Sequence, residues 1–202
     1  MEKYWDKYWE SKGIISRIVD FMRTHYFADV PIFHLGNIKD KVILEAGCGS
    51  SETLVRIAKK AKKVIGLDIS KKSLIVSKDK FKKNKIPINK YSLVKGDIKK
   101  MKFKDNTFDI TFNAGVIEHF DDDKINNEPI EEMIRVTKKG GKVMIIVPSV
   151  YSPYYLYYLV SRIPGLKRIF PGEESHRFYT FRLMRKQLDE LQVAHPPAAQ
   201  RE

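Results

Sequence analysis

Cysteine and long apolar runs are scarce in this sequence of 202 residues. Cys48 is the single cysteine, so no disulfide can form within the chain, and we expect a reducing compartment. No apolar run approaches the roughly 18 residues that a membrane span needs, and the longest candidate is residues 154–160. Residues 1–6 lack the charged and then apolar pattern of a secretory signal. We therefore expect a cytoplasmic protein without a membrane span.

Negative charge is also in short supply, because 38 Lys and Arg oppose 25 Asp and Glu and give a net charge of +13. Such a balance raises the question of nucleic acid. The lysines are spread over the polar faces of expected helices and over loops, as at Lys59, Lys60, Lys62 and Lys63. Arginine and aromatic residues are not interleaved as a base-stacking platform requires. A solvated basic surface is the favoured interpretation, and RNA or DNA binding stays an alternative.

The chain is organised around residues 42–51. They begin as a short apolar run typical of a buried strand, break into Gly47 and Gly49, and lead into a helical pattern. Glycine is needed where the backbone bends sharply or approaches a ligand, and a helix start presents unpaired N–H groups. The pattern predicts a strand, a tight turn and a helix that together cradle a nucleotide-like cofactor. Cys48 is interpreted as a small residue filling this turn, with a catalytic thiol as the alternative.

The spacing of the glycines indicates which cofactor to expect. A dinucleotide fingerprint needs G-x-G-x-x-G, and Glu52 stands at its third glycine, which disfavours a nicotinamide dehydrogenase. The pattern is instead acidic-x-Gly-x-Gly, with Glu45 two residues before Gly47. It resembles motif I of the class I S-adenosylmethionine-dependent methyltransferases, although Ser51 replaces a usual glycine. The segment at residues 113–120, with its Ile-Glu-His, resembles their small-molecule, type 11-like branch. The resemblance covers roughly residues 40–150 and implies that the cofactor contacts Glu45, Gly47, Cys48 and Gly49.

Two acidic residues follow the next two expected strands. Asp68 closes the strand at residues 63–68, where a carboxylate can accept hydrogen bonds from both ribose hydroxyls. The next residue, Ile69, is also a candidate for cofactor binding. Asp97 and Ile98 follow the strand at residues 91–95. The resemblance implies that the Asp97 carboxylate accepts from the adenine amine and that the Ile98 N–H reaches a ring nitrogen. The simpler alternative for each aspartate is a turn or cap residue.

The segment after the fourth expected strand, residues 108–112, contains the remaining site candidates. The resemblance implies that its first residues line the methionine side of the cofactor, namely Asn113, Ala114 and Gly115. Histidine side chains titrate near neutrality, so His119 is a candidate general base, or else it is held structurally at the strand-to-helix junction. Glu118 is adjacent to it, and adjacent helical residues do not share a face, so we do not expect both to face the substrate. Three aspartates at residues 121–123 are interpreted as a helix start rather than a metal site.

The two ends of the chain are expected to be helical. Residues 3–27 predict one or two helices, whose aromatic ridge of Tyr4, Trp5, Tyr8 and Trp9 packs on the core or forms a flap over the cofactor. Residues 28–41 are expected to be a linker. Residues 151–163 predict an aromatic helix that lines an acceptor pocket, packs in the core or forms a homodimer face. A further helix is expected at about residues 181–191, and the tail after it lacks a strand pattern, so the final strands are expected to be missing or altered.

Strand and helix patterns alternate between residues 42 and 148, which predicts an α/β fold of the Rossmann-like, doubly wound type. We expect at least five mainly parallel strands, at residues 42–46, 63–68, 91–95, 108–112 and 142–148, with helices on both faces. Helices are expected at about residues 52–62, from a cap at Ser70 to about residue 81, and in a segment that ends at residues 138–141. The predicted organisation is an N-terminal cap at residues 1–40, a cofactor-binding core at residues 41–150 and a helical C-terminal segment at residues 151–202. The resemblance implies methyl transfer from S-adenosylmethionine to a small molecule. A non-catalytic cofactor-binding subunit and an RNA methyltransferase are the alternatives.

Overall fold

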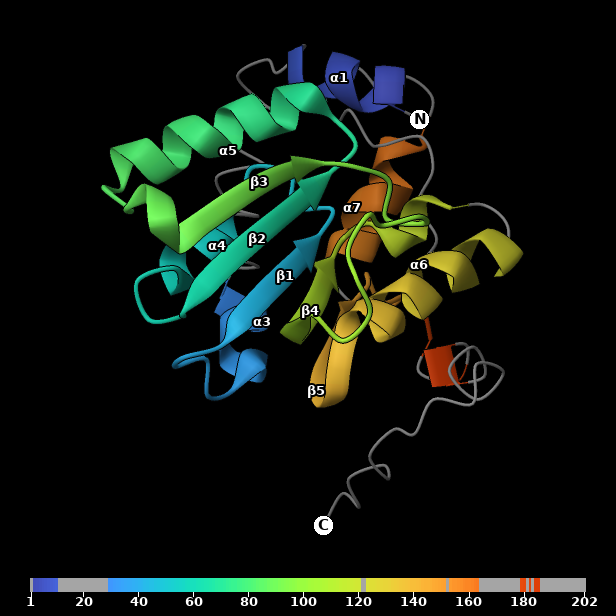
Figure 1. The fold of residues 1–202 in the computed structure, drawn as a ribbon. Helices are drawn as coiled ribbons and strands as arrows, with labels where there is room; N and C mark the ends of the chain where they lie inside the picture. The colour runs from blue at the N-terminus through green and yellow to red at the C-terminus, as the bar shows by residue number, and fades with distance from the viewer. Residues whose placement is uncertain are drawn as a thin grey trace.

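Five parallel strands form one sheet through the middle of the protein (Figure 1). A computed structural model describes residues 2–10, 29–120, 123–151, 153–163, 179–180, 182 and 184–185. The strands are β1 Val42–Ala46, β2 Lys63–Asp68, β3 Tyr91–Lys95, β4 Phe108–Ala114 and β5 Thr137–Ile146. Their order is β3-β2-β1-β4-β5, and each neighbouring pair is parallel. The strand order reverses between β1 and β4, which is the switch point where doubly wound sheets bind ligands.

Helices cover both faces of this sheet, as predicted. The described helices are α1 Glu2–Glu10, α3 Asp29–Leu35, α4 Glu52–Ile57, α5 Lys71–Lys83, α6 Asp123–Val136 and α7 Pro153–Ser161, with 3₁₀ turns η2 Ile88–Lys90 and η3 Ile117–His119. On one side, α4 contacts α3, α5 and β2. On the other side, α6 contacts β4 and β5, and Figure 1 shows it across the sheet from α4 and α5.

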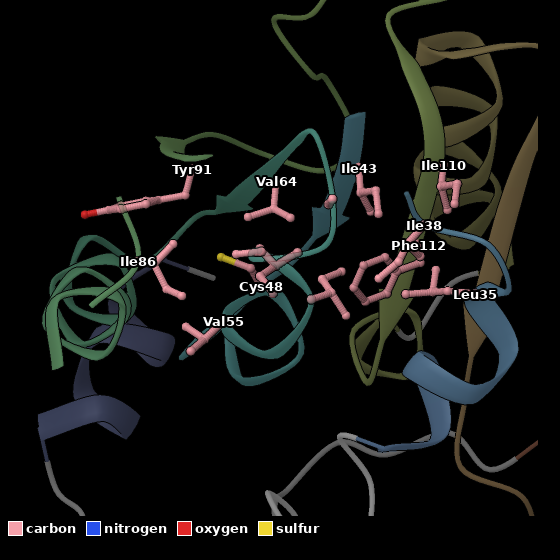
Figure 2. Close-up of a cluster of buried hydrophobic side chains, with 14 of the residues drawn as sticks. Leu35, Ile38, Ile43, Cys48, Val55, Val64, Ile86, Tyr91, Ile110 and Phe112 are labelled. Atoms are coloured by element: carbon pink, nitrogen blue, oxygen red, sulfur yellow. The ribbon is translucent and has the colours of Figure 1, made fainter. Parts of the chain in front are cut away.

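Strand β1 divides the core in two because successive side chains leave opposite faces of a sheet. Ile43 joins a cluster with residues of α3, α4 and α5, part of which Figure 2 shows. Leu44 joins a second cluster with Met133 and Val136 of α6. Both β1 side chains are fully buried. Burial on both faces explains why this strand is a continuous apolar run rather than an alternating one.

The linker predicted at residues 28–41 contains a helix instead, so this prediction was wrong. Asp29 begins α3, Pro31 lies in its first turn, and Gly36 follows its end with a φ of +74°. Proline near the start and glycine just past the end are common at helix boundaries, because the first turn needs no N–H donor. Leu35 is buried in the first core cluster. Proline and glycine, which suggested a loop, here mark the two ends of a short helix.

The junction between α6 and β5 also differs from the prediction. The helix ends at Val136 and the strand begins at Thr137, whereas the sequence predicted a helix up to residues 138–141 and a strand from residue 142. The backbone N–H groups of Asn106 and Thr107 donate to the carbonyls of Arg135 and Val136 at 3.0 and 2.8 Å. These bonds satisfy carbonyls of the last helical turn, so the helix stops earlier.

Smaller differences concern element ends. Helix α4 ends at Ile57 rather than at residue 62, and β4 extends to Ala114. The cap at Ser70 is confirmed, since its Oγ accepts a hydrogen bond from the Ser73 N–H at 3.2 Å. The predictions for residues 11–27, for Asp121 and Asp122, for most of residues 181–191 and for the tail lie outside the described residues. Within the described part of the chain, no helix is long and apolar enough to cross a membrane.

Candidate functional site

The glycine turn after β1 is tied to the end of β2. Gly47 and Gly49 have φ values of +80° and +48°, in the left-handed region that favours glycine. The N–H groups of Gly47 and Cys48 both donate to the Leu67 carbonyl, at 2.8 and 2.9 Å. Ser51, which replaces the family's further glycine, also has a positive φ, of +54°. The turn therefore adopts the predicted tight conformation at the switch point of the sheet.

Gly47 has a steric role as well. A Cβ built on it would lie 2.3 Å from Val116 Cγ2, far inside the contact distance. The missing side chain therefore makes room for the segment that follows β4 and leads into η3. Sequence reasoning foresaw a close approach at this turn but did not identify Val116 as the group that approaches.

The Cys48 side chain points into the first core cluster (Figure 2). The thiol is buried, and burial raises its pKa well above the usual value. A Cβ on Gly66 of β2 would lie 2.8 Å from the Cys48 Sγ, so that glycine leaves space for the sulfur. This burial favours the small-residue interpretation over a reactive thiol. Only the backbone of Cys48 is then available to contact a cofactor.

Asp68 closes β2 and holds the turn in place. Its Oδ2 accepts the Gly49 N–H at 2.8 Å, and its Oδ1 accepts the Ser70 N–H at 2.8 Å. Burial raises the pKa of the carboxyl group, and the hydrogen bonds from Ser70 and Gly49 oppose that rise. Ile69 lies half-buried between these contacts. The Asp68 side chain therefore connects the glycine turn to the start of α5.

Glu45 is deeply buried, with 5% of its surface exposed, and Glu118 of η3 is buried to a similar degree, with 4% exposed. Burial, and then the charge of Asp68, raise the pKa of Glu45 well above its usual value. Its Oε2 accepts no hydrogen bond from any of the described residues. Lys80 of α5 bonds to Glu52 at 2.5 Å and acts on Glu45 through its charge, which opposes the rise in pKa.

The residues predicted to lie beside adenine follow β3. Asp97 Oδ1 accepts the Lys99 N–H at 2.9 Å, which gives the turn that the simpler alternative predicted. Ile98 is buried in the second core cluster. These contacts leave the Asp97 carboxylate only half-buried, at the same edge of the sheet as Asp68.

Arg135 of α6 holds the loop that follows Asp97, and sequence reasoning missed it. Its guanidinium donates to the carbonyls of Met101 and Phe103 at 3.0 and 2.9 Å, and to Glu132 at 2.6 and 2.8 Å. Glu132 also accepts the Met101 N–H at 2.6 Å. The only signal in the sequence is the spacing of Glu132 and Arg135 on one helix face, three residues apart.

At the end of β4, Asn113 is fully buried and donates from Nδ2 to the Ala46 carbonyl of β1 at 2.6 Å. Its Oδ1 has no hydrogen-bond partner among the described residues. Ala114 follows half-buried, and Gly115 has a φ of +75° and donates to the Ile146 carbonyl at 3.1 Å. The segment therefore joins the ends of β1, β4 and β5.

The predicted base His119 lies at the end of η3 and is half-buried. Its ring meets Trp5 of α1 edge-on, with the ring centroids 4.8 Å apart. Asp6 of α1 accepts the Ser70 hydroxyl at 2.5 Å, and Glu2 pairs with Lys95 at 2.5 Å. Helix α1 thus contacts residues at the ends of β2 and β3 and the turn after β4, and Figure 1 shows it beyond the strand arrowheads.

Part of the aromatic ridge predicted for α1 is described. Tyr4 is exposed and contacts Trp5, whose ring lies against His119. The side chains of Tyr8 and Trp9 lie outside the described part of the chain, so the choice between a flap and packing on the core stays a prediction. Among the described residues, no group of three His, Cys, Asp or Glu side chains is arranged to hold a metal ion.

The fold and this arrangement of residues define a class I methyltransferase that depends on S-adenosylmethionine. A family described as a methyltransferase domain matches residues 44–145, which run from β1 to β5. The chain belongs to this methyltransferase domain family, and its cofactor is S-adenosylmethionine. This assignment takes the place of the nicotinamide and non-catalytic alternatives.

Named relatives agree with this assignment. The demethylmenaquinone methyltransferase of Oceanobacillus iheyensis is 28% identical over 194 residues, covering 89% of this chain and 74% of the relative. That of Bacillus cereus is 25% identical over 194 residues, covering 89% and 75%. The crystal structure of magnesium protoporphyrin IX methyltransferase from Synechocystis with bound SAH has a TM-score of 0.66 at 16% identity, covering 94% of this chain and 86% of that one. The structural likeness shows the fold.

Proposed function

We propose that this methyltransferase acts on a small apolar acceptor of the quinone type, with the cofactor lying across the C-terminal ends of β1, β2 and β4. When bound, S-adenosylmethionine supplies a methyl group already activated by its sulfonium. The chain itself has to bind and align the cofactor and the acceptor and to exclude water. Alignment of this kind can lower the barrier by up to about 7–11 kcal/mol. The names of the Oceanobacillus and Bacillus relatives support the acceptor class.

The buried carboxylate of Glu45 is the observation that supports this cofactor position most directly. Leaving a buried acceptor such as Oε2 without a hydrogen bond costs on the order of 1–3 kcal/mol. The ammonium of the cofactor's methionine part carries three N–H donors and a positive charge. We propose that it donates to Glu45, which would remove this cost and favour the ionised carboxylate.

Asp68 suits the ribose. A carboxylate offers about four acceptor sites, and the Gly49 and Ser70 N–H groups occupy one on each oxygen. The remaining sites can accept the two ribose hydroxyls. Because the same two bonds fix the side chain, it is already oriented before the cofactor binds, and little side-chain entropy is lost on binding.

The remaining predicted residues are assigned by their place along the same edge. Asp97 and Ile98 follow β3, and we propose that they contact adenine as the family resemblance implies. The Asn113 Oδ1, another buried acceptor without a hydrogen bond from the described residues, is a candidate for the methionine part together with Ala114 and Gly115. Glu45 and Asn113 lie on neighbouring strands, β1 and β4.

His119 is the proposed base for acceptors that lose a proton. It follows β4 by five residues and is half-buried, so it can lie close to an acceptor and take its proton. Trp5 covers one side of its ring, at 4.8 Å between centroids. We propose that α1 shields this side of the site from water, in line with the flap predicted from the sequence.

The test is production of S-adenosylhomocysteine from S-adenosylmethionine with a short-chain demethylmenaquinone analogue. We expect turnover with the wild type and none with Asp68→Asn, which should also lose cofactor binding. His119→Gln should lower kcat while leaving the KM for S-adenosylmethionine unchanged. Methylation of RNA without any turnover of quinones, with binding that weakens steeply as salt rises, would overturn the acceptor class.

A further inference from the structure

Helix α7 carries apolar side chains on its exposed surface. Leu156 and Leu159 are 66% and 45% exposed and lie on one helix face, since they are three residues apart. Ile163, 49% exposed, follows in the turn that ends the helix, and Tyr151, 86% exposed, precedes it. Single exposed apolar residues are ordinary, but four within thirteen residues form a patch that indicates a binding surface.

Aromatic and basic side chains lie beside this patch. Tyr155 and Tyr158 stack at 6.4 Å between centroids and are half-buried. The Arg162 guanidinium lies over the Tyr158 ring at 5.1 Å from its centroid. Aromatic rings with polar tips and basic side chains beside an aliphatic stripe are the combination that settles at the boundary between water and lipid.

The sequence around α7 carries charge of one sign. No acidic residue occurs between Glu132 and Glu173, and Arg162, Lys167 and Arg168 follow α7 along the chain. The chain as a whole carries a net charge of +13. A surface of anionic lipid attracts such a segment. Nucleic acid would also supply negative charge, but it would offer no apolar phase in which the aliphatic side chains of Leu156 and Leu159 could be buried.

The patch lies at the edge of the sheet where the site is. The chain leaves β5 at Ile146, whose carbonyl bonds to Gly115, and begins α7 at Pro153. Figure 1 shows α7 near the C-terminal ends of β1 and β4. At nine residues α7 is too short to span a bilayer, so it can only lie on one.

We propose that α7 docks this protein on an anionic phospholipid surface, with the stripe of Leu156, Leu159 and Ile163 entering the lipid and Arg162 meeting the headgroups. Docking would bring the cofactor edge of the sheet toward the membrane. This inference concerns a surface outside the cofactor site and does not depend on the identity of the methyl acceptor.

The test is co-sedimentation of the full chain with vesicles of phosphatidylcholine alone and of phosphatidylcholine mixed equally with phosphatidylglycerol. We expect binding to the anionic vesicles and little to the neutral ones. Leu156→Gln with Leu159→Gln should weaken binding roughly tenfold or more, because two leucines no longer leave water. Arg162→Gln should weaken it roughly fivefold, in line with one basic side chain near a charged surface.

The control is Phe33→Gln with Ile88→Gln, which removes two side chains that are 83% and 74% exposed on α3 and η2. It should bind vesicles as the wild type does, and circular dichroism should show both double variants folded. Equal loss of binding in the control would overturn the assignment to α7. The assignment would also be overturned if the wild type did not bind vesicles, sedimented as a dimer in sedimentation velocity, and became a monomer with Leu156→Gln and Leu159→Gln.

Discussion

Alanine at Gly47 should damage the protein through two separable effects. The residue has a φ of +80°, and the Cβ of an alanine there would meet Val116 Cγ2 at 2.3 Å. Holding a residue with a side chain in the left-handed region costs roughly 1–2 kcal/mol. Forcing an extra methyl group into a packed contact costs about 1–3 kcal/mol more. We therefore expect Gly47→Ala to lower the free energy of unfolding by about 2–5 kcal/mol.

The chain offers a matched control for the backbone part. Gly36 has a φ of +74°, and a Cβ there would meet no atom within 4 Å. Gly36→Ala should therefore show only the conformational cost, roughly 1–2 kcal/mol. Urea unfolding measures both free energies. In thermal melts each kcal/mol should appear as about 2–4 °C for a chain of this size.

A double variant isolates the collision. Val116→Ala removes the two Cγ atoms and leaves a Cβ 3.2 Å from the added atom, so Gly47→Ala with Val116→Ala should recover most of the steric cost. The coupling free energy between the two sites should be about 1–3 kcal/mol, while distant sites would be additive. Equal destabilisation by Gly47→Ala and Gly36→Ala, or additive effects of Gly47→Ala and Val116→Ala, would refute the reasoning.

Asp68, Glu45 and Arg135 each support a further prediction. Asp68→Asn replaces one of the two oxygens that accept the Gly49 and Ser70 N–H groups by an NH₂ group, so urea unfolding should show a cost of about 1–3 kcal/mol. Calorimetry should show loss of S-adenosylhomocysteine binding, and an unchanged affinity would contradict the ribose assignment. Burial raises the pKa of Glu45, so the folded protein holds this proton more tightly than the unfolded chain does, and the resulting stability is present below the unfolded-state pKa and is lost as pH rises through the folded-state pKa. Glu45→Gln should remove that loss when the free energy of unfolding is measured from mildly acidic to alkaline pH. Parallel pH curves for the variant and the wild type would argue against this role of Glu45. Arg135→Lys keeps the charge but loses the planar guanidinium that bonds to two carbonyls at once, so it should lower the free energy of unfolding by about 1.5–3 kcal/mol and speed amide hydrogen exchange in residues 96–107. Wild-type protection of these amides in the variant would exclude the proposed role of Arg135 in fixing this loop.

The sheet was predictable to a large extent. The bounds of β1, β2 and β3 agree with the sequence prediction, because each strand is a short apolar run between turn residues. The start of α5 at Ser70 was also foreseen, since a serine side chain caps a helix through contacts only three residues away. Where the prediction failed, as at Thr137, the end of the element depends on N–H groups from the distant loop at Asn106.

The sequence by itself determined the alternation of strands and helices, the glycine turn and the acidic residues at the strand ends, because each rests on local chemistry within a few residues. Only the tertiary structure decided which groups meet: Val116 over Gly47, Cys48 against Gly66, and Trp5 against His119. Contacts of this kind join residues far apart in the chain, and they depend on strand register and helix packing. No pattern within a single segment specifies those two properties.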